Sequence, residues 1–195
     1  MPPQLKGPHI LLRESRERDV AERLALGRDP DIARMFGASL EHAQSPLTEA
    51  EVVQMFEKIR KDEYGWVIEH EEHFLGEIGL RDLNKQDRKA RLAIGLFDTK
   101  KLGRGFGREA IFLVLNYVFH ELQLNRTDLR VLAYNTRAIR CYKACGFVVE
   151  GVERESAFID NTYHDDVIMA ILASEFKRPG GARIAGPRGK GQVSS

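Results

Sequence analysis

The residues best suited to chemistry lie in a glycine-rich stretch, GRGFGR, at residues 103–108. Three glycines alternate here with basic side chains, and two lysines precede them: Gly103, Arg104, Gly105, Gly107, Arg108, Lys100 and Lys101. An amphipathic segment follows, so the stretch opens a helix predicted over residues 106–123. The first N–H groups of a helix carry partial positive charge, and glycine lets an anion approach them closely. The stretch therefore predicts an anion site, for which a pyrophosphate is the natural occupant.

Two other interpretations of these glycines compete with an anion site. A tight chain reversal uses glycine for its positive φ, although one glycine is enough for that purpose. A dinucleotide-binding turn is the second, because GFGREA fits its pattern. The acid expected about twenty residues later is missing, however, since the chain reads Ala133-Tyr134-Asn135 there. The Walker A phosphate loop is excluded, because no Gly-Lys-Ser/Thr follows. The anion site is favoured, with the simple turn as its alternative.

A second cluster of candidate residues, NTRAIRCYKACGF, follows at residues 135–147. Asn135 is a predicted helix N-cap and Gly146 a predicted helix stop. Between them lies Tyr142, whose phenol has a reference pKa near 10 and is suited to protonating a thiolate. A tyrosine with its ring packed in the core would give the same pattern. The spacing N-x-x-A-x-x-x-Y-x-x-x-G-F becomes informative only together with the glycine-rich stretch.

Hydrophobic periodicity places both clusters in one domain of mixed elements. Strands are predicted at 9–14, 64–71, 73–83, 90–98 and 128–134, and on both sides of a hairpin turn at Asp160-Asn161. Helices are predicted within 15–29, stopping near Gly27 and Pro30, after the capping box of Thr48 and Glu51, and over 106–123 and 136–146. The order β-α-α-β-β-β-α-β-α-β-β predicts an α+β fold whose central sheet is mostly antiparallel.

The composition is that of a globular protein. Of 195 residues, 43% are hydrophobic and 30% are charged, which suits one domain with a full core. No apolar run reaches the length of a membrane span, and the first ten residues contain no signal-peptide core. Cys141 and Cys145 have neither disulfide-framework nor zinc spacing, so we expect reduced thiols in a cytoplasmic protein. Trp66 is most simply a core residue.

The end of the chain differs from the rest in charge. Residues 177–195 are rich in glycine and proline and hold five of the 30 basic residues, which leaves 25 basic against 29 acidic residues before them. This basic tail has no apolar periodicity, so it is predicted to be disordered. Nucleic acid is not an expected partner of this protein, except through the tail.

The glycine-rich stretch, the Asn135–Phe147 pattern and the final YHDDVIMAIL strand together resemble the GNAT N-acetyltransferase superfamily, in particular its RimJ/RimL-like and spermidine-acetyltransferase-like branch. The similarity covers roughly residues 8–173. Each motif is loose alone, but the three in this order and spacing are specific. The resemblance implies a single acetyltransferase domain over residues 1–176, with a sheet that splays where acetyl-CoA, the co-substrate, binds.

The resemblance also implies which residues bind acetyl-CoA. The pyrophosphate would lie on main-chain N–H groups around Gly103 to Arg108, and the strand near Gly95-Leu96-Phe97 would pair with the pantetheine arm and supply the oxyanion N–H. Leu102 stands where the family often has Gln or Arg. The full predicted set is Gly95, Leu96, Phe97, Leu102, Gly103, Arg104, Gly105, Phe106, Gly107, Arg108 and Asn135. No metal is predicted, because His164, Asp165 and Asp166 alternate sides of a strand.

In the family pattern Tyr142 takes the place of the general acid, which protonates the departing thiolate. Relatives often carry a basic carboxylate at the start of the splayed strand, but this chain reads Arg91-Leu92-Ala93 there. Glu77 is a weak candidate for the base, Asp82 is another, and a water chain is a third route.

Two classes of function remain open from the sequence. The leading one is transfer of an acetyl group from acetyl-CoA to a primary amine, either a protein N-terminus or a small amine such as a polyamine or aminoglycoside. The other is a non-catalytic acyl-CoA sensor or regulatory protein, and a donor such as succinyl-CoA is a further variant. The expected partner is the amine acceptor, a homodimer is one expected assembly, and no membrane partner is expected.

Overall fold

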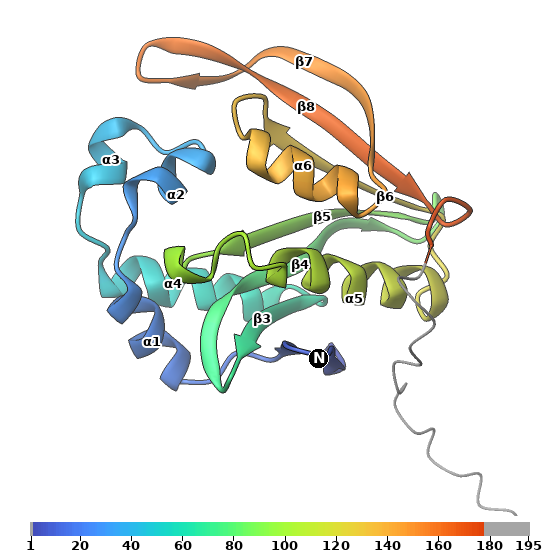
Figure 1. Ribbon diagram of the computed structural model, residues 1–195, viewed down its shortest axis with the longest axis horizontal. Helices are drawn as coiled ribbons and strands as arrows, with labels where there is room; N and C mark the ends of the chain where they lie inside the picture. The colour runs from blue at the N-terminus through green and yellow to red at the C-terminus, as the bar shows by residue number, and fades with distance from the viewer. Residues whose placement is uncertain (1, 178–195) are drawn as a thin grey trace, which may run out of the picture.

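The structure, a computed structural model, describes residues 2–177. These residues form one domain of mixed α and β elements (Figure 1). The strands are β1 (Leu5–Lys6), β2 (Leu11–Arg13), β3 (Gly65–His70), β4 (His73–Asn84), β5 (Lys89–Leu96), β6 (Arg126–Leu132), β7 (Val148–Ile159) and β8 (Thr162–Leu172). The helices are α1 (Arg18–Leu26), α2 (Pro30–Met35), α3 (Leu40–Gln44), α4 (Glu49–Lys61), the 3-10 helix η1 (Thr99–Lys101), α5 (Phe106–His120) and α6 (Thr136–Ala144). Apart from Lys177, the predicted basic tail lies outside the described residues.

All eight strands join one sheet in the order β1-β2-β3-β4-β5-β6-β8-β7. Every neighbouring pair is antiparallel except β5 and β6, which are parallel. The α+β class and the mostly antiparallel sheet predicted from the sequence are therefore confirmed. The predicted hairpin turn is also confirmed, because Asp160 and Asn161 join β7 to β8 with φ values of 51° and 59°, as in the tight turns that suit hairpins.

Helices cover both faces of the sheet, and strand β3 shows why. Trp66 and Ile68 face the larger core cluster with Val114 of α5, whereas Val67 faces a second cluster with Phe56 of α4. Because successive side chains of a strand point to opposite faces, β3 must be apolar on both sides, and all three of its residues named here are fully buried. Trp66 is thus a core residue, as expected.

Two short helices were missed by the sequence analysis. Pro30 was expected to stop the preceding helix, but it is instead the first residue of α2. The Asp29 side chain accepts a hydrogen bond from Ile32 N at 2.9 Å, so Asp29 is the N-cap and Pro30 occupies a position where its missing N–H costs nothing. Helix α3 follows, with Ser39 as its N-cap. The two helices lie beside the tip of the β7–β8 hairpin (Figure 1).

The sheet opens between β5 and β6. These strands pair only at Lys89↔Arg126, Ala90↔Thr127 and Arg91↔Asp128, and no pairing continues beyond Arg91. β5 stays paired with β4 as far as Leu96, and β6 stays paired with β8 as far as Leu132. The splayed sheet that the sequence resemblance implied is therefore present, and its gap lies next to the segment that enters α5.

Candidate functional site

The glycine-rich stretch forms a row of free main-chain donors. Among residues 2–177, no acceptor lies within hydrogen-bond distance of the N–H groups of the six residues from Gly103 to Arg108, and the first N–H to be bonded is that of Glu109, which donates to Gly105 O at 3.0 Å. Gly105 caps the N-terminus of α5 with a φ of 93°, a conformation that favours glycine. An anion placed here would meet consecutive N–H groups and the positive end of a 15-residue helix.

The gap between β5 and β6 exposes main-chain groups of β5. Phe97 N donates to Leu75 O at 3.0 Å, so Phe97 and Leu75 form a hydrogen-bonded pair. Such pairs alternate along antiparallel strands, which directs the N–H and C=O groups of Ile94 and Leu96 away from β4 and into the gap. Leu96 is therefore the residue of the Gly95-Leu96-Phe97 segment that offers main-chain groups there. The Phe97 N–H is already used within the sheet.

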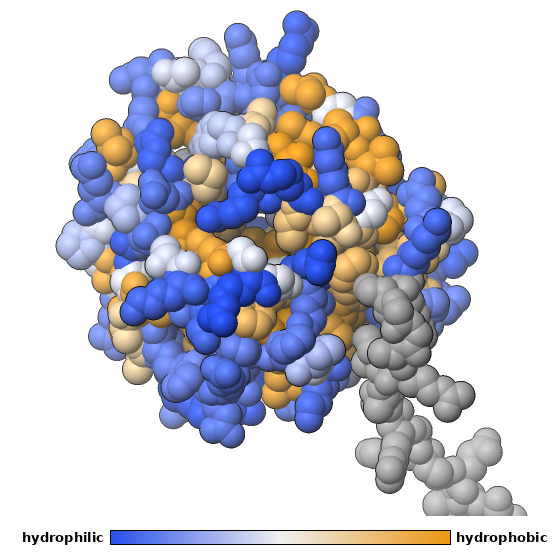
Figure 2. All heavy atoms as spheres, in the orientation of Figure 1, coloured by the Kyte–Doolittle hydropathy of each residue, from blue (hydrophilic) through white to orange (hydrophobic). Residues whose placement is uncertain are grey.

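A cavity of about 550 Å³, here called the loop cavity, joins these features. Its lining includes Leu96 of β5, the stretch from Lys101 to Arg108, and Asn135, Arg137, Ala138, Arg140, Cys141, Tyr142 and Ala144 from α6 and its N-cap. Figure 2 shows a hollow with hydrophobic atoms inside and hydrophilic residues at its rim, near the segment that enters α5. The structure thus brings the predicted residues from Leu102 to Arg108, Asn135 and Tyr142 together. Gly95 and Phe97 do not line this cavity.

Tyr142 lies on the buried face of α6 and is 9% exposed. Its ring packs edge-on against Phe147, with ring centroids 5.9 Å apart. Burial raises the pKa of the Tyr142 phenol above its usual value, and the neighbouring Cys141 and Cys145 raise it further. The phenol therefore stays protonated at neutral pH, as a proton donor must. No residue among 2–177 forms a hydrogen bond with its hydroxyl, which leaves the proton available to the cavity.

Asn135 has a structural task at this site. Its Oδ1 accepts from Ala138 N at 3.1 Å, which confirms the predicted N-cap of α6, and its Nδ2 donates to Met35 O of α2 at 3.3 Å. Both ends of the amide are therefore engaged. Asn135 lines the loop cavity while it connects α2 to α6.

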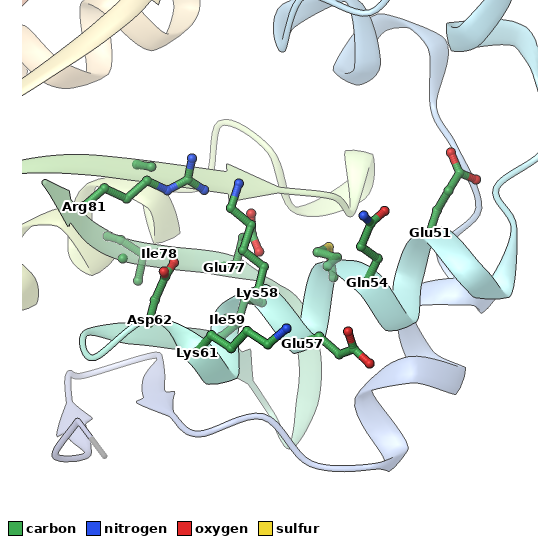
Figure 3. Close-up of a pocket in the computed structure, with 14 residues that line it drawn as sticks. Glu51, Gln54, Glu57, Lys58, Ile59, Lys61, Asp62, Glu77, Ile78 and Arg81 are labelled. Atoms are coloured by element: carbon green, nitrogen blue, oxygen red, sulfur yellow. The ribbon is translucent and has the colours of Figure 1, made fainter.

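Glu77 lies on the other face of the sheet, opposite Gly95. It lines a second cavity of about 390 Å³, the α1–α2 cavity, together with Arg23, Phe36 and Phe97. It also lines a third space of about 680 Å³ between α4 and β4, the α4 hollow, which Figure 3 shows with Lys58 and Arg81. Burial raises the pKa of the Glu77 carboxyl, whereas Arg81, Lys58 and Arg23 act against that shift.

The loop cavity and the α1–α2 cavity share one wall, because Ile32 and Phe36 of α2 line both. The sequence pattern did not predict these residues, nor the helix α2 that carries them. The pair Asp29-Pro30 was the available signal, since an acidic cap followed by proline is typical of a helix start. Asp82, the other candidate base, lies at the far end of β4, where it is exposed and its carboxylate is 3.6 Å from Arg91 Nη1.

Both cysteines are free thiols, as expected. In residues 2–177, no group of three or more His, Cys, Asp or Glu side chains is arranged to hold a metal ion. Across the same residues, no helix combines the length and the apolar character needed to cross a membrane.

Comparisons with known proteins agree with this geometry. Residues 9–148 match the family model described as the Acetyltransferase (GNAT) domain. The uncharacterized N-acetyltransferase YokL of Bacillus subtilis is 27% identical over 172 residues, which cover 88% of this chain and 94% of YokL. The spermidine N(1)-acetyltransferase of Vibrio cholerae is 34% identical over 106 residues, which cover 54% of this chain and 61% of that enzyme.

Solved structures show the same fold. A putative acetyltransferase superposes with a TM-score of 0.77 and 25% identity, covering 90% of this chain and 89% of its own. The spermidine N-acetyltransferase of Vibrio cholerae, solved in complex with CoA and spermine, gives a TM-score of 0.70 and 27% identity over 87% of this chain and 98% of its own.

A splayed sheet, a helix that begins with free N–H groups and the match over most of the domain define the class: the chain belongs to the GNAT acetyltransferases. It is an N-acetyltransferase that uses acetyl-CoA as its co-substrate.

Proposed function

We propose that this enzyme moves the acetyl group of acetyl-CoA to a primary amine that enters through the α1–α2 cavity, with Tyr142 as the general acid. The row of free N–H groups from Gly103 to Arg108, at the mouth of the β5–β6 gap, is the observation that carries this proposal. A pyrophosphate is the group of acetyl-CoA that suits such donors. The pantetheine amides would then pair with the main-chain groups of Ile94 and with the Leu96 C=O, which face the gap, and would leave the Leu96 N–H free.

The residues around the gap divide the chemistry among them. The Leu96 N–H is directed to stabilise the oxyanion that forms when the amine nitrogen attacks the thioester carbon. As the C–S bond breaks, the Tyr142 hydroxyl gives its proton to the departing sulfur. The new N–C bond leaves a surplus proton on nitrogen, which a base must remove.

Glu77 is the proposed base for that proton. Its carboxyl lines the α1–α2 cavity, on the face of the sheet away from Tyr142. Acid and base would then act from opposite faces of the sheet, with the thioester between them in the gap. A raised pKa also makes the carboxylate a better proton acceptor than an exposed glutamate.

Release of free thiol from acetyl-CoA in the presence of a panel of amines tests the proposal. The panel contains amino acids, their amides, polyamines, an aminoglycoside and a short peptide with a free N-terminus. We expect thiol release with at least one class, and one acetyl group added to that amine by mass spectrometry. The Tyr142→Phe protein is the control, because it keeps the aromatic ring and loses the proton.

The result also decides between the proposed function and its alternative. Calorimetric binding of acetyl-CoA without thiol release from any amine would favour a sensor over an enzyme and would contradict the proposal. Thiol release from succinyl-CoA but not from acetyl-CoA would overturn the assignment of the donor.

A further inference from the structure

Arg23 is a buried cation that forms no ion pair with any residue among 2–177. It lies in α1 with 7% of its surface exposed, and it lines the α1–α2 cavity. Nη1 donates to Gly27 O at 2.6 Å. Nε is buried and finds no acceptor among residues 2–177, and Nη2 has no hydrogen bond to them either. The edge of the guanidinium formed by Nε and Nη2 is therefore free.

The surroundings of Arg23 compensate little of its charge. Its Cζ lies 4.3 Å from the centroid of the Phe97 ring, a contact that supports a cation weakly. Burial and then the charge of Arg28 lower the pKa of the Arg23 guanidinium to about 10, while the charges of Glu77 and Glu51 act against that shift without a hydrogen bond to the guanidinium. A buried charge without a partner is costly, so such groups are concentrated at functional sites.

Two other arginines show what full compensation looks like in this chain. Arg13 is buried as deeply, but Nη1 and Nη2 donate to Asp19 at 2.8 Å and Nε donates to Glu69. Arg28 lines the same α1–α2 cavity as Arg23, yet its Nη2 lies 2.6 Å from Glu51 and its Nε donates to Ser45 O. Arg23 therefore differs from both, because no carboxylate of residues 2–177 is hydrogen-bonded to it.

A free guanidinium edge matches one ligand group closely. The two oxygens of a carboxylate accept parallel hydrogen bonds from the Nε and Nη2 edge of arginine. Glu77 lines the same cavity, so an amine and a carboxylate on one small molecule would find opposite charges there. The remaining acid of the lining, Asp29, already accepts from Ile32 N as the cap of α2.

We propose that the α1–α2 cavity binds the carboxylate of the acceptor through Arg23, and hence that the acceptor is a small amino carboxylate. This inference rests on the proposed function, and it names the substrate class for that site. A polyamine fits less well, because Arg23 repels a second ammonium group and Glu77 is the single uncommitted carboxylate among the described residues that line the cavity.

Matched pairs of amines test the inference directly. Thiol release from acetyl-CoA is measured with 4-aminobutyrate against 4-aminobutyramide, with leucine against leucinamide, and with spermidine. Hydrogen bonds to charged groups are worth enough to change kcat/KM by roughly tenfold to a hundredfold. We expect at least one acid to exceed its amide by that factor, and to exceed spermidine.

Substitutions assign the preference to Arg23. We expect Arg23→Gln to bring the acid-to-amide ratio close to one, mainly by raising KM for the acid, and Arg23→Lys to retain part of the ratio. Arg28→Gln is the matched control. It also removes a positive charge from the lining of this cavity, but the charge of Arg28 is already paired with Glu51. We expect the ratio to survive in this control.

A binding measurement keeps the inference testable without turnover. With CoA present, 4-acetamidobutyrate is titrated against wild type and Arg23→Gln by calorimetry, and the corresponding amide serves as the control. If wild type binds the acid more tightly than the amide and Arg23→Gln does not, the inference is supported even when no amine releases thiol. The absence of thiol release would then contradict only the proposed function. Efficient acetylation of spermidine or peptide N-termini without any preference for acids overturns the inference and leaves the proposed function standing.

Thermal unfolding separates binding from a purely structural role. Because Arg23→Gln removes an uncompensated buried cation, we expect its melting temperature to be equal to or above that of wild type. A large fall in melting temperature together with an unchanged acid-to-amide ratio would show that Arg23 serves folding, and would overturn the inference.

Discussion

At the scale of single residues, the proposed site depends on polar groups that form no hydrogen bond with residues 2–177. Tyr142 keeps its proton because its phenol is buried, and the N–H groups from Gly103 to Arg108 stay free because they form no hydrogen bond with any acceptor among residues 2–177. The three predictions at this scale each change one residue of the proposed site.

Replacing Tyr142 by Phe should lower kcat by about 10²–10⁴-fold, the usual contribution of a general acid. The ring contact with Phe147 is kept, so the affinity for CoA and the melting temperature should stay close to those of wild type. Steady-state kinetics and calorimetry measure the two effects separately. An unchanged kcat would mean that water or another group protonates the thiolate.

Replacing Gly105 by Val should weaken CoA binding, because a side chain would project toward the free N–H groups. Apart from its neighbours along the chain, a Cβ at Gly105 would meet no atom of residues 2–177 within 4 Å, but the φ of 93° strains any residue other than glycine. Gly27→Val is a matched control, since Gly27 has a φ of 67° and the same open surroundings. If both variants stay folded and bind CoA like wild type, the anion site at the loop is wrong.

Replacing Glu77 by Gln should remove one limb of the pH profile. A base acts only when deprotonated, so activity should rise with pH through the pKa of Glu77, which burial raises. The limb should therefore lie at a higher pH than an ordinary glutamate would give, and it should vanish in Glu77→Gln. Asp82→Asn, at the exposed end of β4, is the control. An identical profile in Glu77→Gln would assign proton removal to water.

At the scale of elements, β2, α1 and β3 are held together by a buried ionic cluster. Arg13 of β2 is 1% exposed and pairs with Asp19 of α1, which is completely buried, and with Glu69 of β3. Breaking a buried ion pair by removing one partner leaves an uncompensated charge. This cluster fixes the start of α1, and thus the helix that carries Arg23.

Arg13→Met should accordingly destabilise the protein by about 3–5 kcal/mol. Arg126→Met, which removes a half-buried surface arginine whose Nη2 lies 2.6 Å from the exposed Glu150, should cost no more than about 1 kcal/mol. Urea unfolding of the two variants measures the difference. Equal losses of unfolding free energy in the two variants would contradict the view that burial increases the contribution of the Arg13 cluster to stability.

The elements also show what a sequence can and cannot predict. Helices α4 and α6 were predicted with their caps because Thr48, Glu51 and Asn135 make local contacts, over three residues of chain. Helix α2 was missed because Pro30 was interpreted as a stop. The shared wall at Ile32 and Phe36 depends on contacts between distant parts of the chain, which no local pattern encodes. The loop and Tyr142 were accessible through spacing, whereas the free edge of Arg23 needs the packed structure.

At the scale of the whole molecule, one carboxylate connects the early helices to the final hairpin. Asp160, in the turn between β7 and β8, accepts from Arg34 Nη1 of α2 at 2.7 Å and from Leu40 N of α3 at 2.9 Å. A further contact ties α2 to the segment between β6 and α6, where Tyr134 OH donates to Arg34 O at 2.7 Å. These contacts hold α2 in place as the wall between the two cavities.

Asp160→Ala should raise KM for the acceptor several-fold and leave the affinity for CoA unchanged, because the α1–α2 cavity loses the fixed position of α2. Arg34 and then Leu40 N lower the pKa of Asp160, so the link persists at neutral pH and is lost only as the pH falls through that lowered value. Glu150→Ala, which removes another ion pair of the hairpin, is the control. Equal KM values in wild type and Asp160→Ala would show that α2 keeps its position without this link.

The gap between β5 and β6 has one more consequence, for the behaviour of the protein in concentrated solution. A strand with free N–H and C=O groups is an edge, and edges recruit strands from other chains into aggregates. Here the edge lies in the interior of the sheet, at Ile94 and Leu96, and both residues line the loop cavity. A co-substrate that pairs with this edge would also shield it. The enzyme should therefore be least prone to aggregate when CoA is abundant, so that its solubility follows the supply of its own co-substrate.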